Sequence, residues 1–250
     1  MIRVINIRDG GSLFHYAHFI CDCLFPEIIC NIFKFREVIR LKRIDQTIGN
    51  FSKIYKDVMN IKNTELFIHN FNKLNVPLIK YKKKEQYANK ECFDKFRNYI
   101  FTRYNIKNLE YNNNYPEVIL IKRNGRVNLI NDAHLKKMNN NMTTGKERRE
   151  INNINQIEIF LKNKYKYNFK SLYFENLPFD EQVKYFNNAK LIICAHGAVM
   201  SNMFFCKEGT KIVEVTCGMK WPFFDKISNI LKLKHVKCFK NNFNNIIKYI

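Results

Sequence analysis

The sequence has few residues that break regular secondary structure and no long uninterrupted apolar run. Glycine (8) and proline (5) are scarce among the 250 residues, which excludes a collagen-like or low-complexity chain. The most apolar stretch, residues 14–33, is interrupted by His18, Asp22 and Pro26, so we expect no membrane span. The chain opens with a strand-like pattern at residues 2–7 instead of a signal peptide. These absences predict a soluble, cytoplasmic protein.

Cysteine pairs of the metal-binding or redox type are also missing. The chain has eight cysteines, and none forms a Cys-x-x-Cys motif. Several lie in apolar runs such as residues 191–194, where a buried free thiol is the common state. An even number of cysteines also fits a disulfide framework, but a chain this long and apolar does not need one. We therefore expect free thiols and a reducing compartment.

The charge of the chain is strongly positive. Lys and Arg number 43 against 22 Asp and Glu, a net charge of +21, and such an excess attracts nucleic acid, acidic membranes or phosphorylated small molecules. The lysines are scattered, however, and they accompany asparagine runs at 112–114 and 139–141, a pattern typical of AT-rich coding. The charge alone therefore does not identify a partner, and the motifs must do so.

The second half of the chain alternates between strand-like and helix-like patterns. Short apolar runs bounded by turn residues predict strands, and apolar residues at helical spacing predict the helices between them. Such alternation indicates β-α-β crossovers and a parallel sheet. Ligands of such sheets bind outside the carboxyl ends of the strands, here the loops after Cys194 and Val215. The predicted strands are 118–121, 170–174, 190–194, 211–215 and 235–236, and the predicted helices are 151–163, 178–188, 198–205, 222–231 and one from 243.

The first half is less regular. The strand at 2–7 leads into a helix for which Ser12 is a plausible N-cap. Residues 107–115 are polar and form the best candidate for a linker. We therefore expect two α/β lobes, residues 1–106 and 115–250, with a cleft between them.

Three titratable residues follow one another on the first predicted helix. His15, His18 and Asp22 are spaced i, i+3 and i+7, and at 100° per residue they fall within roughly 60° of arc. Such a stripe on an otherwise apolar helix is costly unless it meets water, a partner or a substrate. It indicates either a cleft-facing general base or a satisfied His–Asp pair at the edge of the core. A zinc site with a cysteine is a weaker alternative, because no other ligand cluster has metal-like spacing.

The strand at 190–194 runs into the loop Ala195-His196-Gly197-Ala198. Glycine allows the backbone to approach a ligand closely, and the amides of the next helix are available for an anion. Asn202, one turn further on, is positioned to orient a hydroxyl or the loop itself. The loop suits a sugar diphosphate, and the alternative is an ordinary turn with a surface histidine.

Two further positions carry charge at the ends of predicted strands. Glu214 lies within the apolar strand 211–215, and it either accepts the two ribose hydroxyls of a nucleotide or belongs to a buried ion pair. Arg123 and Arg126 follow the strand at 118–121. Guanidinium groups match diphosphate oxygens, although a solvated basic loop is the alternative.

Together these segments resemble the core of the family 61 glycosyltransferases. The strongest similarity lies in His196-Gly197-Ala198 and in Glu208-Gly209-Thr210-Lys211, within a set of blocks whose order and spacing both fit. Two weaker blocks agree, one containing Arg123 and Arg126 and the other reading His18-x-x-x-Asp22. The strong blocks cover residues 177–182, 189–198, 201–205 and 208–215.

The resemblance implies a GT-B architecture with two Rossmann-like lobes, residues 1–106 on the acceptor side and residues 115–250 binding the nucleotide sugar. It implies inverting transfer of a sugar such as xylose or N-acetylglucosamine from a nucleotide-sugar donor, often UDP-linked, to a glycan or glycoprotein. The family's motif positions make donor-site candidates of the following residues: Arg123, Arg126, His196, Gly197, Ala198, Asn202 and Glu214.

No Asp-x-Asp motif occurs in the chain. Glycosyl transfer with a divalent cation usually needs such a carboxylate pair beside the diphosphate, so we expect no metal cofactor. Cations and helix amino termini then stabilise the leaving group. The base that deprotonates the acceptor hydroxyl is expected to be Asp22 or His18.

Three alternatives remain open from the residues. The first is a catalytically inactive relative that binds glycans or acts as a scaffold. The second is a basic nucleic-acid-binding protein. The chain has no recognised nucleic-acid-binding motif, however, and we do not expect a nucleic acid as a partner. The third is another enzyme of the same architecture, such as a nucleotide-sugar epimerase.

Overall fold

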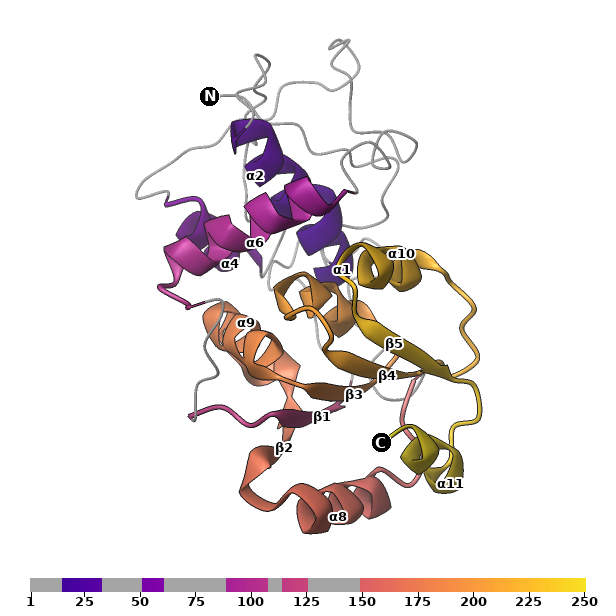
Figure 1. Cartoon of the computed structure of the whole chain (residues 1–250). Coiled ribbons are helices and arrows are strands. Elements are labelled where there is room, and N and C mark those ends of the chain that lie inside the picture. Colours follow the sequence, from indigo (N-terminus) through magenta and orange to yellow (C-terminus); the bar gives the residue numbers. More distant parts are fainter. Residues whose placement is uncertain (1–14, 33–50, 61–88, 108–113, 126–148) are drawn as a thin grey trace. The chain divides into compact units, whose positions relative to one another are not determined.

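The computed structural model describes residues 15–32, 51–60, 89–107, 114–125 and 149–250 (Figure 1). The described residues fall into two compact units, one ending at Arg103 and the other beginning at Tyr104. Several sequence predictions lie outside the described residues: the strand at 2–7, the Ser12 cap, most of the 107–115 linker and Arg126. The functions assigned to the two lobes stay predictions.

The described part of the amino-terminal unit consists of helices packed through aromatic side chains. Phe25 of α2 makes edge-to-face contacts with Phe93 and Phe96 of α6, at centroid distances of 5.4 and 5.3 Å. The sheet expected for this lobe is absent from the part of the unit that the structure describes. The helices are α1 (Tyr16–His18), the π-helix η1 (Phe19–Leu24), α2 (Phe25–Ile32), α4 (Ser52–Val58) and α6 (Lys90–Arg103).

One buried polar contact links α2 to α4. The hydroxyl of Tyr55 donates a 2.6 Å hydrogen bond to Oε1 of Glu27, and both residues are almost fully buried. A buried carboxylate is tolerated only with such partners. The bond therefore fixes the position of α2 against α4.

The carboxy-terminal unit contains a five-stranded sheet in which every pairing is parallel. Its central strands are apolar, and Leu191 to Ala195 of β3 are all buried, whereas the two outermost strands are polar in part and less buried. This matches the sequence prediction of a buried parallel sheet, and the predicted strands are confirmed within a few residues. The strands are β1 (Val118–Lys122), β2 (Phe169–Tyr173), β3 (Leu191–Ala195), β4 (Lys211–Val215) and β5 (Lys234–Cys238).

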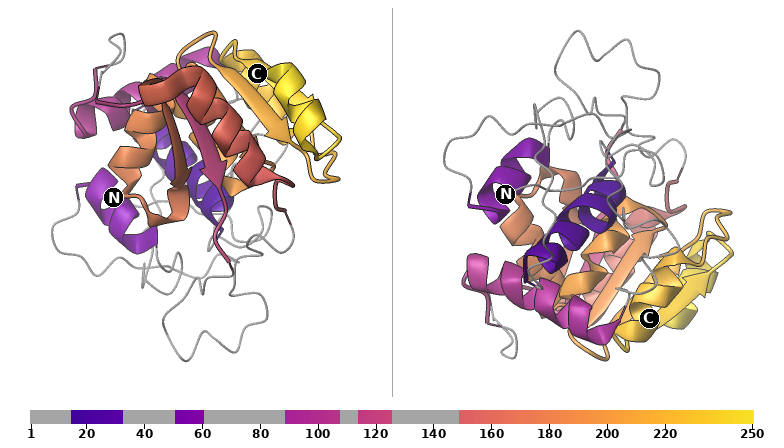
Figure 2. Two further views of the ribbon diagram at one scale, coloured as in Figure 1. Left: turned by 90° about the horizontal axis from the view of Figure 1, so that it is seen from below. Right: turned by 90° about the horizontal axis from the view of Figure 1, so that it is seen from above.

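Helices cover both faces of the sheet (Figures 1 and 2). Ile157 and Leu161 of α8 and Ile246 of α11 pack on one face, in a core with alternate residues of the strands. The helices α9, η7 and α10 cover the other face. Their bounds are α8 (Ile154–Tyr165), α9 (Phe179–Asn188), the 3-10 helix η7 (Ala198–Phe205), α10 (Phe223–Ile230) and α11 (Phe243–Ile246), with short 3-10 turns η5 (Lys166–Asn168), η6 (Phe174–Asn176) and η8 (Ile247–Tyr249).

The strand order is β2-β1-β3-β4-β5. The chain passes from β1 outward to β2 and then returns to the opposite side of β1 as β3. Sheets with such a reversal bind their ligands in the crevice outside the carboxyl ends of the two strands beside it, which here are β1 and β3. The fold therefore favours the residues that follow Lys122 and Ala195 as ligand contacts.

Some local predictions need correction. Pro178 is the N-cap of α9, with extended backbone angles, and the first helical residue is Phe179. The described cysteines are free, and all except Cys217 are buried, as expected. No helix in the described ranges is long and apolar enough to cross a membrane.

Candidate functional site

Two arginines converge on the backbone carbonyl of His196 at the β1–β3 crevice. Nη1 of Arg123 lies 3.2 Å from this oxygen, and Nη1 of Arg149 lies 3.4 Å from it. Arg123 follows β1 and His196 follows β3, and the register places Ile121 beside Cys194. The two guanidinium groups therefore concentrate positive charge at the carboxyl edge of the sheet, where they suit a diphosphate.

Sequence reasoning included Arg123 but missed Arg149. Arg149 precedes the predicted helix at 151–163 as the second residue of an Arg-Arg pair. In the sequence, nothing distinguishes that pair from the many other scattered Lys and Arg residues. Arg149 lies in the connection between β1 and α8, and β1 pairs with β3, the strand that His196 follows. Only this tertiary arrangement brings Arg149 beside His196. The predicted companion Arg126 lies outside the described residues.

Gly197 makes room for the Arg123 side chain. A Cβ atom at position 197 would lie 2.8 Å from Nη1 of Arg123. The backbone of Gly197 is extended, with φ of 170°, so glycine is not required by its dihedral angles. As the N-cap of η7, Gly197 also has no side chain to shield the first amides of that helix. The close approach of Arg123 is the reason for glycine here, and the expected close approach to a ligand stays a prediction.

Substituting Gly197→Ala is therefore expected to displace the Arg123 guanidinium with little loss of stability. Because the clash involves the end of a flexible side chain, we expect a cost of about 1 kcal/mol or less in unfolding free energy, and a roughly tenfold or greater rise in the Kd for a nucleoside diphosphate. Calorimetric titration and chemical unfolding measure the two quantities.

Gly125→Ala is the matched control, because nothing lies within 4 Å of a Cβ at that position. Equal diphosphate affinity in Gly197→Ala and the control would show that Arg123 does not depend on the glycine.

A buried chain of hydrogen bonds runs from His196 across β4 to β5. Nδ1 of His196 lies 2.5 Å from Oε1 of Glu214, and Nε2 of His235 lies 2.7 Å from Oε2. Glu214 is 1% exposed. Burial by itself raises the pKa of this carboxyl, but the hydrogen bonds from His196 and His235 outweigh burial and lower the pKa to about 2. Glu214 is therefore a carboxylate at neutral pH.

Glu214 forms the buried pair that was one of its two interpretations. Both carboxylate oxygens are engaged by histidines and the side chain is almost inaccessible. These contacts support the buried pair, and the predicted contact of Glu214 with a ribose stays a prediction. Sequence reasoning missed His235 and placed it only in a strand. The available signal was that His235 and Glu214 lie in consecutive predicted strands. Matching the two residues requires the pairing register of β4 and β5, which cannot be read from the sequence.

Asn202 joins η7 to α9. It is fully buried, and its Nδ2 donates a 3.1 Å hydrogen bond to Oε1 of Gln182 on α9. Gln182 in turn donates to the backbone oxygen of Leu177. Both roles expected for Asn202, orienting a hydroxyl or the loop, stay predictions. Ala198 begins η7 directly after Gly197.

The predicted catalytic helix differs from a regular α-helix. His15 is the N-cap of α1, and residues 19–24 form the π-helix η1. Since a π-helix has a wider turn than an α-helix, the arc calculated at 100° per residue does not extend to Asp22, whose side chain lies outside the described residues. The rings of His15 and His18 are neighbours, with centroids 6.4 Å apart. Burial, and then the charge of His18, lower the pKa of His15.

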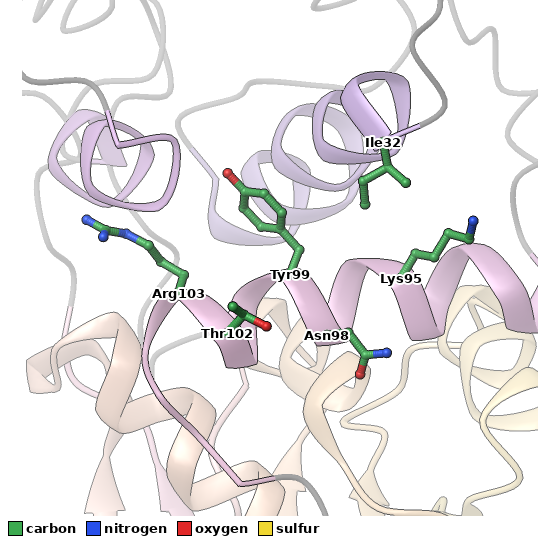
Figure 3. Close-up of a pocket in the computed structure, with 6 residues that line it drawn as sticks. All are labelled: Ile32, Lys95, Asn98, Tyr99, Thr102 and Arg103. Carbon is green, nitrogen blue, oxygen red and sulfur yellow. The ribbon is translucent and has the colours of Figure 1, made fainter.

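A hollow of about 440 Å³ lies on α6 of the amino-terminal unit (Figure 3). Its lining includes Tyr99, whose hydroxyl donates to the backbone oxygen of Val58, and Arg103, which is paired with Asp57 at 2.8 Å. These polar groups already have protein partners. The hollow contains no residue that the sequence singled out.

Comparison with known proteins identifies the family of the chain. The family model described as Glycosyltransferase 61 matches residues 16–213, which is more than half of the chain. The match includes Arg123, Arg149 and His196 and ends one residue before Glu214. A search of curated proteins finds no match. The chain therefore belongs to the glycosyltransferase 61 family.

Proposed function

We propose that the protein transfers a sugar, such as xylose or N-acetylglucosamine, from a UDP-linked donor to a hydroxyl of a glycan or glycoprotein. The transfer is a single displacement that inverts the anomeric carbon. The observation that carries the proposal is the convergence of Arg123 and Arg149 at the β1–β3 crevice. The family match supports glycosyl transfer in general.

The chemistry requires positive charge beside the leaving group. As the bond from the sugar to the diphosphate breaks, negative charge develops on the diphosphate oxygens. Preorganised cations stabilise that charge without reorganising during the reaction. Arg123 and Arg149 supply the cations, and the first amides of η7 supply hydrogen-bond donors. This arrangement supports a transfer that needs no metal ion.

The GT-B architecture is part of the same proposal. In it, residues 115–250 bind the nucleotide sugar, and residues 1–106 bind the acceptor and supply the base, His18 or Asp22. An imidazole or a carboxylate is the kind of group that can take the proton of the acceptor hydroxyl. His18→Gln and Asp22→Asn test the assignment, and the variant lacking the base is expected to lose about 10²-fold or more in turnover.

Thermal unfolding with a panel of nucleoside diphosphates and nucleotide sugars tests the proposed function. A ligand present at 100 times its Kd stabilises the folded state by about 2.7 kcal/mol. We expect a clear shift with one nucleotide, unchanged by EDTA, followed by transfer of its sugar in an activity assay. A shift that disappears with EDTA contradicts metal independence.

Two other results would favour other functions. Binding without hydrolysis or transfer of the donor points to an inactive relative. No nucleotide binding together with salt-sensitive binding of RNA or DNA points to a nucleic-acid-binding protein.

A further inference from the structure

The carboxylate of Glu214 accepts hydrogen bonds from two histidines on different elements. Nδ1 of His196 and Nε2 of His235 lie 2.5 and 2.7 Å from its two oxygens. The side chains of His196 and His235 are 8% and 4% exposed. Since an ionised carboxylate only accepts hydrogen bonds, each of these two ring nitrogens carries a hydrogen. The tautomers are thus assigned from the hydrogen-bond partners.

The second ring nitrogen of His235 also faces acceptors. Its Nδ1 lies 3.3 Å from Oγ of Ser228 and 3.4 Å from Oδ1 of Asp225. The single hydroxyl hydrogen of Ser228 goes to the backbone oxygen of Asp225 at 2.9 Å, the shorter of its two contacts. Ser228 and the Asp225 carboxylate are therefore both acceptors toward His235. Both ring nitrogens of His235 carry hydrogen, and the ring is an imidazolium.

The balance of charge in the cluster supports the same state. Nζ of Lys237 lies 2.5 Å from Oδ2 of Asp225, so the cluster contains two carboxylates and one ammonium group. A protonated His235 brings the total to zero. Lys237 pairs with the partly exposed Asp225, so a neutral His235 leaves the charge of the buried Glu214 uncompensated, which is costly. With the total at zero, the cluster needs no second protonated ring at His196.

We propose that His235 is a positioning residue whose ring, with both nitrogens facing acceptors, carries the positive charge that neutralises Glu214 and keeps His196 neutral. A neutral His196 donates through Nδ1 to Glu214, so its Nε2 accepts a hydrogen bond and cannot donate one to a phosphate oxygen. Among the described residues, Nε2 of His196 makes no hydrogen bond. Its partner is a hydroxyl, of the donor sugar or of the acceptor. The hydroxyl partner rests on the proposed function, whereas the protonation states do not.

The other groups that face this network do not alter the assignment. The guanidinium groups of Arg123 and Arg149 contact the carbonyl of His196, and so favour its neutral ring. The thiols of Cys194 and Cys217 interact with Glu214, and burial raises the pKa of both above that of an ordinary thiol. These thiols therefore stay uncharged near neutral pH. The ring of Phe224 covers His196 edge-on, at 5.5 Å between centroids.

Nitrogen-15 NMR of histidine-labelled protein at pH 7.5 tests the protonation states directly. The six histidines of the chain are assigned with single glutamine variants. We expect both ring nitrogens of His235 to be protonated, and only Nδ1 of His196. A singly protonated His235 would overturn the proposal. Because this readout needs no substrate, it stands even if transferase activity is absent, so failure of the proposed function is seen separately.

The variant His235→Gln tests the consequence for His196. Gln keeps a donor toward Glu214 but removes the charge, so the full carboxylate charge then favours a protonated His196. The acidic limb of the pH–rate profile is expected to move upward by about one pH unit or more, and His235→Lys, which restores a cation, to move it back. Lys234→Gln removes a charge from the exposed neighbouring position and is the matched control. A folded His235→Gln enzyme with an unmoved limb contradicts the proposal.

His196→Gln identifies which hydroxyl is bound. Loss of nucleotide-sugar affinity, with unchanged affinity for the nucleoside diphosphate, assigns the sugar hydroxyl. Loss of turnover with both affinities unchanged assigns the acceptor hydroxyl. Weaker binding of the nucleoside diphosphate itself places His196 on a phosphate oxygen and overturns the assignment of Nε2.

Discussion

Replacing Arg123 with alanine is expected to lower the rate of sugar transfer by about 10²–10³-fold, because a preorganised charge beside the leaving group is lost. Arg123 follows β1 at the switch point of the sheet and donates to the carbonyl of His196. The guanidinium lies at an edge of the sheet instead of in its core. We therefore expect the midpoint of thermal unfolding to fall by no more than about 4 °C.

Two comparisons make the Arg123 result specific. Lys122→Ala removes the same charge from the preceding residue, whose ammonium is paired with Glu158 of α8, and it should leave turnover nearly unchanged. Arg123→Lys keeps the charge but not the planar fork, and is expected to recover part of the rate. Full activity in Arg123→Ala, or an equal loss in Lys122→Ala, removes Arg123 from the proposed mechanism.

Replacing Glu214 with alanine is expected to cost about 3–5 kcal/mol of unfolding free energy, the range measured when one partner of a buried ion pair is removed. The substitution leaves the rings of His196 and His235 buried without their acceptor. Chemical unfolding at pH 7 gives the quantity. A loss below about 1 kcal/mol, typical of an exposed ion pair, would show that the cluster is open to water.

The stability contributed by ionised Glu214 should depend on pH in a defined direction. Its pKa is lowered in the folded state from an ordinary 4.5 to about 2. A lowered pKa stabilises the folded state above the unfolded value, and this contribution is lost as pH falls through the folded value. The loss therefore occurs between about pH 4.5 and 2, and its size is about 3 kcal/mol by linkage.

Glu214→Gln isolates this contribution, because the amide does not titrate. The difference in unfolding free energy between the wild-type protein and Glu214→Gln should shrink as pH falls from 5 to 2.5. Unfolding curves at several pH values measure it. A difference that is constant over this range contradicts the lowered pKa of Glu214.

The strands and helices of the carboxy-terminal unit were predictable because their signals are local. An apolar run such as residues 191–194 and the alternation of strand and helix each lie within one short segment. The loop Ala195-His196-Gly197-Ala198 could be placed at a carboxyl edge for the same reason, since parallel strands all end on that edge. Arg123 was a candidate because it directly follows a predicted strand.

The first helix shows where a local pattern was not sufficient. Its apolar spacing indicated a regular α-helix from Ser12, but residues 19–24 form a π-helix and α1 begins at Tyr16. Six residues are too few for a π-helix to be distinguished from an α-helix by its apolar spacing. The arc expected for His15, His18 and Asp22 was therefore calculated with the wrong angle per residue.

The sequence by itself determined the family resemblance, the parallel sheet and the loop that contains His196. The tertiary structure decided which charged residues meet. Arg149 lies 47 residues from His196, and Glu214 lies 21 residues from His235, so their contacts depend on strand order and register. These depend on how whole strands and helices pack against one another, and no single segment encodes them. For the same reason Glu214, which looked equally suited to a ribose, is a buried partner of two histidines.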